Sequence, residues 1–495
     1  MKTNNQAVAT MKYGELSNFI DGKPSKAAKA ERAQRISPVD GSVLSTYPVS
    51  GVDELNKAVA AAKKAYPDWS SRTIKERAQV FFKYYELLSK NLRSCAEIMH
   101  DEMGKNLDEA MQETAKSLEL TEFACAMPEV ATGDFQEVSR GVECHEEHLP
   151  LGVVASITPF NFPHMVPHWT FPNALVLGNT MVIRPSREAP RTVLRIAEMM
   201  KEAGLPDGVL NVVCGGREVV AAIAEHPDIE AVSFVGSTKV AKMVYQKTTS
   251  RGKRCLALGS ANNHLILMPD AHPANSAANI AASYLGCAGQ RCMSACVLVA
   301  VGDCEETIGK IIEESKRFVP GLNMSAIVNP EAKDSITGYV DRAQKDGAKI
   351  LLDGRNAKAP KGLEKGCYLG PTMIEAKAGS EIAVEENFGP VLTVVRAKNL
   401  TEAIEIANSS PYGNGGSIFT QSGRSAEIFC DKIQAGMVGV NVGVPVPREP
   451  FSFGGWKDSI VGGGDVTGKS AARFWTKIKK ISCKWNPDKP SLWLA

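Results

Sequence analysis

Residues 180–213 have the sequence TMVIRPSREAPRTVLRIAEMMKEAGLPDGVLNVV, and this stretch decides the fold class. The apolar, β-branched run at Thr180–Ile183 predicts a buried strand. Apolar residues in Thr192–Ala203 recur at the spacing of one helix face. Gly204-Leu205-Pro206 predicts the end of that helix, and a second β-branched run at Gly208–Val213 predicts another strand. The stretch therefore predicts a strand-helix-strand unit.

The same pattern extends on both sides of this unit. Val153–Ile157 and Ala231–Val235 predict two more buried strands, and Glu218–His226 and Thr238–Gln246 predict two more helices. Repeated strand-helix units of this length form mostly parallel sheets with helices on both faces. The sequence therefore predicts an α/β fold.

Two further regions complete the predicted organisation. Upstream, amphipathic helices rich in Ala, Lys and Glu are expected to pack around the sheet; they cover Val52–Tyr66, Ile74–Asn91 and Asp108–Ala126. A second alternating region begins near Lys253 and ends near Val444, which predicts a second α/β domain. Its expected strands lie near Leu265–Met268 and Ala295–Val301, and its expected helices near Ala274–Leu285 and Glu305–Phe318.

Composition argues against several classes of partner. The 57 basic side chains of the 495 residues nearly cancel the 55 acidic ones, so charge gives no reason to expect nucleic acid or an anionic membrane. The longest apolar runs are far shorter than the roughly 20 residues that cross a bilayer. The first 19 residues lack a targeting pattern, and the twelve cysteines are irregularly spaced. We therefore expect a cytoplasmic protein whose cysteines are reduced and mostly buried.

Two motif matches are better interpreted structurally. Gly463–Ser470 fits the phosphate-loop pattern, but Phe451–Asp458 before it is rich in glycine and aromatic residues and does not predict the strand that such a loop requires. In Cys144–His148 the two histidines are three residues apart, whereas the zinc-protease pattern needs four. We expect a structural loop, a solvated strand and no metal site.

The stretch GCAGQRCMSAC, residues 286–296, contains three cysteines. Cys292 follows Gly289-Gln290-Arg291 and precedes a predicted strand, so it is expected in a loop beside a cation that favours a reactive thiolate. Cys287 is expected to complete the apolar face of the preceding helix, and Cys296 to begin the strand. From these residues alone, either Cys292 is a nucleophile or all three cysteines belong to the core.

Gly289–Ser294, GQRCMS, resembles the cysteine motif of the aldehyde dehydrogenase superfamily, and in particular its CoA-acylating methylmalonate-semialdehyde dehydrogenase branch, in which an arginine precedes the nucleophile. Further motifs resemble that family in order and spacing over about residues 15–485. They are Pro159–Pro163, Arg184–Ser186, Phe234–Thr238, Glu385–Pro390 and Tyr412–Gly415.

The resemblance implies a fold of three parts. A Rossmann-type dinucleotide-binding domain would comprise residues 1–128, 150–252 and part of 446–471, and an α/β catalytic domain residues 253–445. Residues 129–149 and 472–495 would form a β oligomerisation arm, with Cys144–His148 as an intersubunit strand and Trp475, Trp485 and Trp493 as exposed aromatic contacts. The chain is thus expected to form a homo-oligomer, a dimer or a homotetramer.

The resemblance also implies the chemistry. The Cys292 thiolate would attack an aldehyde, the amide of Asn161 and the backbone N–H of Cys292 would stabilise the oxyanion, and hydride transfer to the nicotinamide cofactor would leave a thioester. Glu386 would bind the nicotinamide ribose with Phe388 nearby, and Ser237 would contact the pyrophosphate. The other expected cofactor residues are Thr158, Phe160, Arg184, Arg187 and Gly215.

The fate of the thioester depends on residue 257. Hydrolytic relatives carry a glutamate in a Glu-Leu-Gly-Gly context that activates water, whereas the matching stretch here is Ala257–Ser260, ALGS. Alanine cannot act as a base. A thiol such as coenzyme A would therefore resolve the thioester and release an acyl-CoA. The alternative is a hydrolytic enzyme that uses another carboxylate and releases a free acid.

Two departures from the family pattern concern substrate and cofactor. Two arginines of the semialdehyde branch hold a substrate carboxylate; Arg291 matches one, but Lys116 stands where the other is expected, so a short carboxylated, malonate-type aldehyde or a neutral one remains open. Arg187 replaces a glutamate that binds the adenosine ribose, which favours NADP unless Glu188 takes over that contact. NAD is the expected cofactor, with NADP as the alternative.

Overall fold

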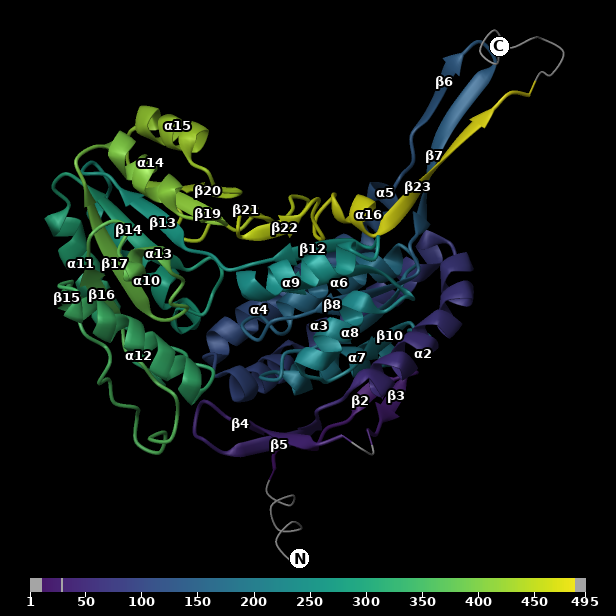
Figure 1. Ribbon diagram of the computed structural model, residues 1–495, viewed down its shortest axis with the longest axis horizontal. Coiled ribbons are helices and arrows are strands. Elements are labelled where there is room, and N and C mark those ends of the chain that lie inside the picture. The colour runs from purple at the N-terminus through teal and green to yellow at the C-terminus, as the bar shows by residue number, and fades with distance from the viewer. Residues whose placement is uncertain (1–10, 28–29, 486–495) are drawn as a thin grey trace, which may run out of the picture.

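The computed structural model describes residues 11–27 and 30–485 of the chain. Figure 1 shows two α/β bodies beside each other and a narrow arm that projects from one of them. The first ten residues of the N-terminal lead-in and Trp493 of the tail lie outside the described residues.

The first sheet has eight strands, and its five central strands are parallel. In spatial order the strands are β22 (Ile460–Gly462), β12 (Arg254–Leu258), β11 (Ile229–Val235), β8 (Val153–Ile157), β9 (Thr180–Arg184), β10 (Leu210–Val212), β2 (Asn18–Ile20) and β3 (Lys23–Ser25). From β8 the chain passes to β9 and β10 on one side of β8. It then returns and forms β11 on the other side of β8. This order is that of a Rossmann-type sheet.

Helices cover both faces of this sheet, as the sequence predicts. On one face lie α2 (Val52–Ser71), α8 (Arg217–Glu225) and α9 (Thr238–Thr249). On the other lie α3 (Ile74–Met103), α6 (Met165–Val176) and α7 (Pro190–Glu202), with α4 (Leu107–Cys125) packed against α3. Alternate residues of β8 point to the two faces: Val154 belongs to the second core, and Val153 and Ala155 to the first.

The second sheet has seven strands, all parallel except β15. In spatial order they are β15 (Lys349–Leu352), β16 (Thr372–Glu375), β17 (Val391–Ala397), β14 (Ala295–Val301), β13 (Asn263–Leu267), β19 (Gly415–Phe419) and β20 (Met437–Val440). One face is covered by α10 (Pro273–Leu285), α11 (Glu305–Lys316) and α12 (Pro330–Lys345), and the other by α14 (Leu400–Ser409) and α15 (Gly423–Lys432). The short helix α13 (Glu381–Val384) precedes β17.

The chain enters the second sheet later than the expected boundary at residue 253. β12 (Arg254–Leu258) pairs in parallel with β11 over five residues and so belongs to the first sheet. The crossing follows Leu258, and the first strand of the second sheet is β13.

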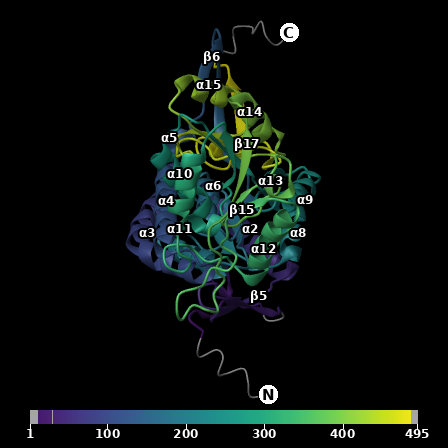
Figure 2. The same cartoon turned by 90° about the vertical axis from the view of Figure 1, so that its left-hand side faces the viewer.

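The arm is a three-stranded antiparallel sheet of β23 (Thr476–Cys483), β7 (Val142–Pro150) and β6 (Phe135–Ser139). It extends away from both bodies in the two perpendicular views of Figures 1 and 2. Cys144–His148 lies within β7, so the expected strand is confirmed. The arm has two edge strands, and Phe135 on β6 is 67% exposed.

Trp475 does not belong to the exposed aromatic surface that we expected in the tail. It follows the short helix α16 (Ala471–Phe474), its side chain is fully buried, and its ring packs edge-on against Phe474. These residues close the main core of the first body, so the arm begins only at Thr476. Trp485, in contrast, is 81% exposed.

The segment Gly463–Ser470 is preceded by a strand, contrary to our expectation, because β22 ends at Gly462. However, β22 is a three-residue, half-buried edge strand antiparallel to β12, and α16 after the loop has only four residues. Neither element resembles the buried strand and long helix that converge on phosphates in a phosphate-binding loop. A structural loop remains the better interpretation.

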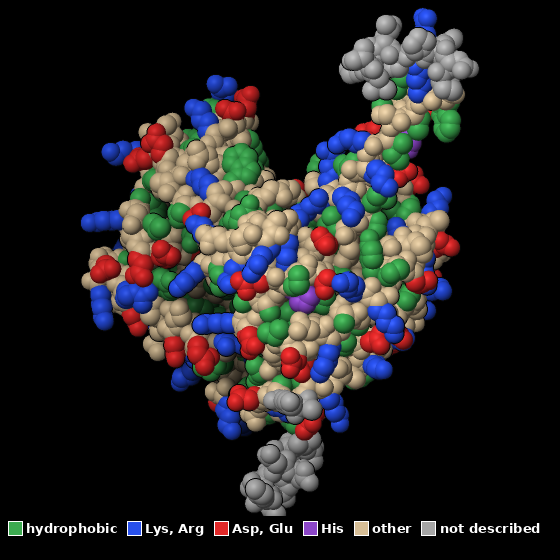
Figure 3. Space-filling model, turned by 45° about the vertical axis from the view of Figure 1, so that its right-hand side comes forward, with side chains coloured by type: hydrophobic (Ala, Val, Ile, Leu, Met, Phe, Trp, Pro, Cys, Tyr) green, Lys and Arg blue, Asp and Glu red, His purple; other side chains and the backbone are tan. Residues whose placement is uncertain are grey.

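Small elements complete the fold: β1 (Gly14–Glu15), β4 (Arg32–Ile36), β5 (Val43–Pro48), β18 (Tyr412–Gly413), β21 (Trp456–Lys457) and α5 (Met127–Val130). Figure 3 shows basic and acidic side chains interspersed over the body, in agreement with the balanced composition. No helix within the described ranges is both long and apolar enough to cross a membrane. The described residues also contain no group of three or more His, Cys, Asp or Glu that could hold a metal ion.

Candidate active site

The loop that carries Cys292 has an unusual backbone. α10 ends in a 3₁₀ turn, η1 (Gly286–Gly289), where Cys287 and Ala288 both have φ of 52° and Gly289 has φ of 73°. A Cβ atom on Gly289 would lie 1.9 Å from the carbonyl oxygen of Gly389, so only glycine fits here. Cys287 therefore does not complete a helix face as expected, although its side chain is buried.

Two asparagines that the sequence did not indicate hold the backbone of Cys292. Asn263 donates from Nδ2 to the carbonyl oxygens of Cys292 and Ser294, each at 2.8 Å, and Asn414 donates to that of Cys292 at 3.0 Å. Asn263 also accepts from the N–H of Gly415. The position of Asn414 in the Tyr412–Gly415 motif was the one sequence signal for this network.

Cys292 lies where two cavities meet. The first has a volume of about 490 Å³ and the second about 710 Å³, and Cys292 is the residue that lines both. The first cavity contains the expected residues Thr158, Phe160, Asn161, Arg184, Ser237, Glu386 and Phe388. The second contains the expected residues Lys116 and Arg291. A thiol in this position can react with a molecule in either cavity.

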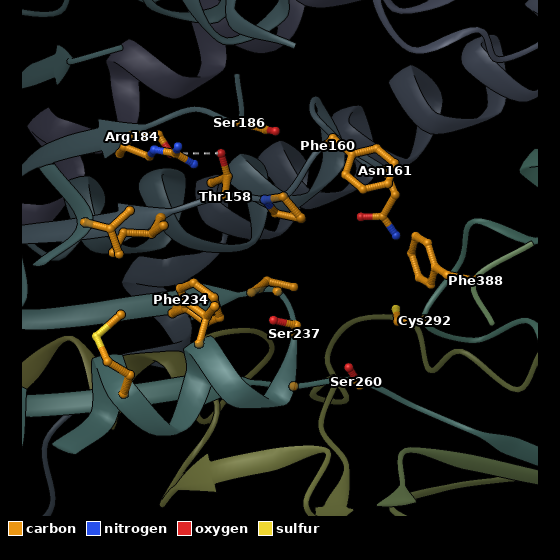
Figure 4. A pocket seen from close by; sticks show the side chains of 18 of the residues that line it. Thr158, Phe160, Asn161, Arg184, Ser186, Phe234, Ser237, Ser260, Cys292 and Phe388 are labelled. Carbon is orange, nitrogen blue, oxygen red and sulfur yellow. Dashed lines mark hydrogen bonds between the residues drawn. The ribbon is translucent and has the colours of Figure 1, made fainter. Parts of the chain in front are cut away.

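The first cavity opens at the carboxyl ends of the central strands. Its wall includes Thr158 after β8, Arg184 at the end of β9, and Phe234 and Val235 at the end of β11. β8 is the strand from which the chain moves off in both directions, and parallel sheets bind ligands at this switch point. In Figure 4, Asn161 and Cys292 project into the cavity from opposite sides, with Phe388 beside them.

Ser237 occupies the N-cap position of α9 but makes no side-chain capping bond. The N-terminus of this twelve-residue helix thus presents backbone N–H groups to the first cavity, where they can bind an anion such as a pyrophosphate. Gly236 precedes it, and a Cβ atom there would lie 2.6 Å from the Phe234 ring. These features fit the expected pyrophosphate contact.

Arg184 and Gly215 are in direct contact, which the sequence did not predict. Arg184 donates from Nε and Nη2 to the carbonyl oxygen of Gly215, at 2.9 and 2.7 Å. Gly215 does not line the first cavity, so it acts on that site through the orientation of Arg184. Thr158 donates from Oγ1 to the Arg184 carbonyl oxygen at 3.4 Å (Figure 4).

Glu386 is the carboxylate among the described residues that line the first cavity. It accepts a hydrogen bond from the N–H of Ala261 at 2.9 Å. Burial nevertheless raises its pKa to about 7, because the charged form loses hydration. Phe388, two residues later, has φ of 50° and packs edge-on against Phe160 with ring centroids 5.9 Å apart.

The Cys292 thiol is protonated at neutral pH in this environment. Burial and, after it, the charge of Glu386 raise its pKa to about 12. The N–H groups of Cys292 and Met293, together with Arg291, lower this pKa but do not outweigh burial. Arg291 thus favours the thiolate in the expected direction, but burial outweighs it, and its guanidinium also binds Glu109, with 2.9 Å between Nη2 and Oε1.

Asn161 precedes α6 by four residues, and the sequence did not predict this helix. Pro167 and Pro172 lie inside α6 and its residues after Met165 are all buried, so it shows neither a helix-like composition nor a polar face. Glu113 accepts from the N–H groups of His164 and Met165, both at 2.9 Å. Glu113 itself forms a fully buried ion pair with Lys105, which lies over the Phe162 ring.

Lys116 and Arg291 both line the second cavity, as expected for substrate contacts, but each is paired with an acidic side chain. Lys116 lies 2.7 Å from Glu449 and 3.0 Å from Glu119. Arg291 pairs with Glu109, and its Nε has no hydrogen-bond partner among the described atoms. Both cations are therefore already neutralised.

Arg187 does not line the first cavity; it lies beside it, with a side chain that is 69% exposed. Glu188 lines the same neighbouring cavity as Arg187 and is held by Arg35 at 2.5 Å, by Arg187 at 3.0 Å and by Asn329 at 3.2 Å, so it would have to leave these partners to take the place of the missing glutamate. Ala257, the position of the missing catalytic base, is fully buried in β12 and lines neither cavity.

Comparison with known sequences places these features in one family. A model of the aldehyde dehydrogenase family matches residues 25–481. Malonate-semialdehyde dehydrogenase of Pseudomonas aeruginosa is 40% identical over 483 residues, which cover 95% of this chain and 97% of the relative. A second relative, the mitochondrial, acylating methylmalonate-semialdehyde/malonate-semialdehyde dehydrogenase of Rattus norvegicus, is 37% identical. The match covers 96% of this chain and 90% of that relative.

Solved structures agree over nearly the whole chain. A methylmalonate-semialdehyde dehydrogenase of Oceanimonas doudoroffii has a TM-score of 0.93 at 37% identity, covering 96% of this chain and 99% of its own. A Sinorhizobium meliloti protein solved in complex with NAD has a TM-score of 0.94 at 39% identity, covering 97% and 99%. The fold, the cavity at the sheet's switch point and these matches together establish that the chain belongs to the aldehyde dehydrogenase family.

Proposed function

We propose that this chain oxidises a short aldehyde that carries a carboxylate, of the malonate- or methylmalonate-semialdehyde type, to an acyl-CoA. The observation that carries the proposal is the position of Cys292 between two cavities. Its thiol can receive an aldehyde from the second cavity and face a cofactor in the first. The names of the relatives supply the substrate class and the acylating reaction.

The first cavity suits a nicotinamide dinucleotide. Its volume, the uncapped N-terminus of α9, Arg184 and the buried Glu386 match the phosphate and ribose groups of such a molecule. Thr158, Phe160, Phe388 and the Arg184–Gly215 pair would hold it. When bound, NAD accepts the hydride. Arg187, at the rim, would also tolerate the 2′-phosphate of NADP.

The chain's own groups then carry the reaction. The Cys292 sulfur, once deprotonated, attacks the aldehyde carbon, and the carbonyl electron pair moves to the oxygen. The Asn161 amide and the Cys292 N–H donate to that oxyanion. Loss of hydride from the same carbon restores a carbonyl and leaves a thioester on Cys292. The thiolate of CoA attacks this thioester and releases the acyl-CoA and the Cys292 thiolate.

The absence of a base supports transfer to CoA over hydrolysis. Ala257 offers no carboxylate, and Glu109 and Glu113 in the second cavity are engaged by Arg291 and Lys105. Glu119, the third carboxylate of that cavity, is paired with Lys116 and Arg448, so the carboxylate best suited to hydrolysis is Glu386, whose pKa of about 7 would suit a general base. This residue therefore defines the competing function, release of a free acid.

Turnover with and without CoA, followed by mass spectrometry of the product, tests the proposal. We expect acyl-CoA from the semialdehyde and little turnover without CoA. CoA-independent release of a free acid would instead establish the hydrolytic reaction.

We further propose that the protein works as a homo-oligomer, a dimer or tetramer joined through the arm, in the cytoplasm. The two edge strands of the arm and the exposed Phe135 and Trp485 support self-association. The twelve free cysteines support a reducing compartment. We propose the same three parts that the sequence predicts: the dinucleotide-binding part, the catalytic part and the arm. The boundary between the first two parts is placed after β12. Sedimentation of a variant that lacks residues 476–495 tests the role of the arm.

A further inference from the structure

The second cavity contains cations but no excess positive charge. Lys116, Arg291 and Arg448 are its basic lining residues, and each is paired with a carboxylate. A site for an anionic substrate usually offers a cation that is free to bind it. A carboxylated aldehyde that binds one of these cations must therefore compete with a carboxylate of the protein.

Arg291 is the cation that cannot easily exchange its partner. Glu109, which binds it, also accepts from the N–H of Cys287 at 2.7 Å and from the hydroxyl of Ser325 at 2.5 Å. Moving Glu109 would break three contacts, two of them to the loop that carries Cys292 and one to Ser325. The Arg291–Glu109 pair thus belongs to the framework of the site.

Lys116 has a different kind of partner. Glu449 lies 2.7 Å from it, on the loop whose preceding residues Pro447 and Arg448 line the cavity; Glu449 itself is not among the lining residues. The Glu449 side chain is 13% exposed. Among residues 11–27 and 30–485, Lys116 is its hydrogen-bond partner. Glu119, the second partner of Lys116, is 43% exposed, so water screens it.

We propose that Glu449 is a specificity-determining residue: its carboxylate occupies, on Lys116, the position that the carboxylate of the substrate takes. This inference rests on the proposed function, because it assumes a carboxylated aldehyde. Glu449 is attached to the protein, so its effective concentration at Lys116 is in the millimolar range or above. A substrate carboxylate then binds only when Glu449 leaves, which raises KM for such substrates and spares neutral aldehydes.

The experiment compares malonate semialdehyde with propanal, which lacks the carboxylate, at saturating NAD and CoA. The quantity measured is the KM for malonate semialdehyde divided by the KM for propanal. We expect Glu449→Gln to lower this ratio about tenfold, because the amide cannot neutralise Lys116. The matched control Glu119→Gln should lower it less than about twofold, because that carboxylate is solvent-exposed. Lys116→Gln should raise the ratio, and the double variant of Lys116 and Glu449 should behave like Lys116→Gln.

An unchanged ratio in Glu449→Gln, or a parallel change for both aldehydes, would overturn the proposal and leave Glu449 a structural residue. If Glu449→Gln lowers the melting temperature, Glu449→Asp is measured as well. The proposal then requires that the KM ratio of Glu449→Asp lies between the ratios of wild type and of Glu449→Gln. Failure of the proposed function is recognised separately: wild-type protein would then form no acyl-CoA from either aldehyde, whatever residue 449 is.

Discussion

Arg291 directs its guanidinium to Glu109, at 2.9 Å, although it is the residue next to the Cys292 nucleophile. Glu109 also binds the N–H of Cys287 and the hydroxyl of Ser325. One carboxylate on α4 thus fixes the loop on which the nucleophile lies. The arginine of the cysteine motif acts first on the shape of this loop and only weakly on the acidity of the thiol.

Glu109→Gln should therefore destabilise the protein. The substitution leaves the mostly buried charge of Arg291 without a partner, and breaking such a pair costs about 3 kcal/mol. Urea unfolding followed by fluorescence measures the loss. Glu119→Gln, whose side chain is more exposed, is the control and should change the free energy of unfolding by less than about 1 kcal/mol. Equal losses in both variants would contradict the framework role of Glu109.

Cys292→Ala should bind NAD but produce no burst of reduced cofactor when mixed with aldehyde. In the proposed mechanism the sulfur forms the bond to substrate, so the rate should fall by about three orders of magnitude or more. Stopped-flow absorbance measures the burst, and a fluorescence titration measures cofactor binding. Cys287→Ala is the control, since that thiol is buried in the 3₁₀ turn and is not assigned to the reaction. A normal burst in Cys292→Ala would exclude the assignment.

Much of the fold follows from local patterns. β8, β14 and the starts of α2 and α3 lie where the sequence predicts them, because each has a clear apolar period of two or 3.6 residues, or a continuous buried run. α6 was missed because it is apolar on all sides and contains two prolines. Its stability comes from burial between the sheet and α3 and α4, which no local window can detect.

The site divides in the same way. Cys292, Asn161 and Glu386 were found through motifs, and the structure brings them to one cavity. The contacts Arg291–Glu109, Lys116–Glu449 and Asn263–Cys292 join residues 29 to 333 positions apart, and spacing carries no information about such pairs. The low solvation of Cys292, which raises its pKa, also depends on packing and not on its neighbours in sequence.

Glu386→Gln should change how stability depends on pH. Burial raises the pKa of Glu386 in the folded protein to about 7, above its value in the unfolded chain, so the stability it contributes is present below about pH 4.5 and is lost as pH rises through 7. The variant should be more stable than wild type at pH 8 by up to about 3 kcal/mol, less where water in the cavity screens the charge. Melting temperatures between pH 5 and 8 measure the difference. Parallel curves for the two proteins would contradict it.

The buried Lys105–Glu113 pair should matter for both stability and turnover. Glu113→Gln leaves Lys105 charged and unpaired in the core, at a cost of about 3–5 kcal/mol. It also weakens the two backbone contacts that fix the start of α6, four residues after Asn161. We expect a lower kcat with little change in the NAD dissociation constant. Glu122→Gln, on the same helix, is the control for folding. A loss of stability at unchanged kcat would restrict Glu113 to a structural role.

Arg187→Glu should shift the choice of cofactor toward NAD. Arg187 is exposed beside the first cavity, and Glu188 cannot oppose a 2′-phosphate because Arg35 and Asn329 hold it in place. A carboxylate at position 187 would repel that phosphate and could accept from a ribose hydroxyl. The ratio of kcat/KM for NADP to that for NAD should fall about tenfold or more, since one charge reversal near a dianion is worth at least about 1.4 kcal/mol. Arg187→Gln should give an intermediate ratio, because it removes the attraction without adding repulsion. If neither variant changes the ratio, the adenosine end of the cofactor does not reach Arg187, and its ribose must be selected by another residue of the cavity wall.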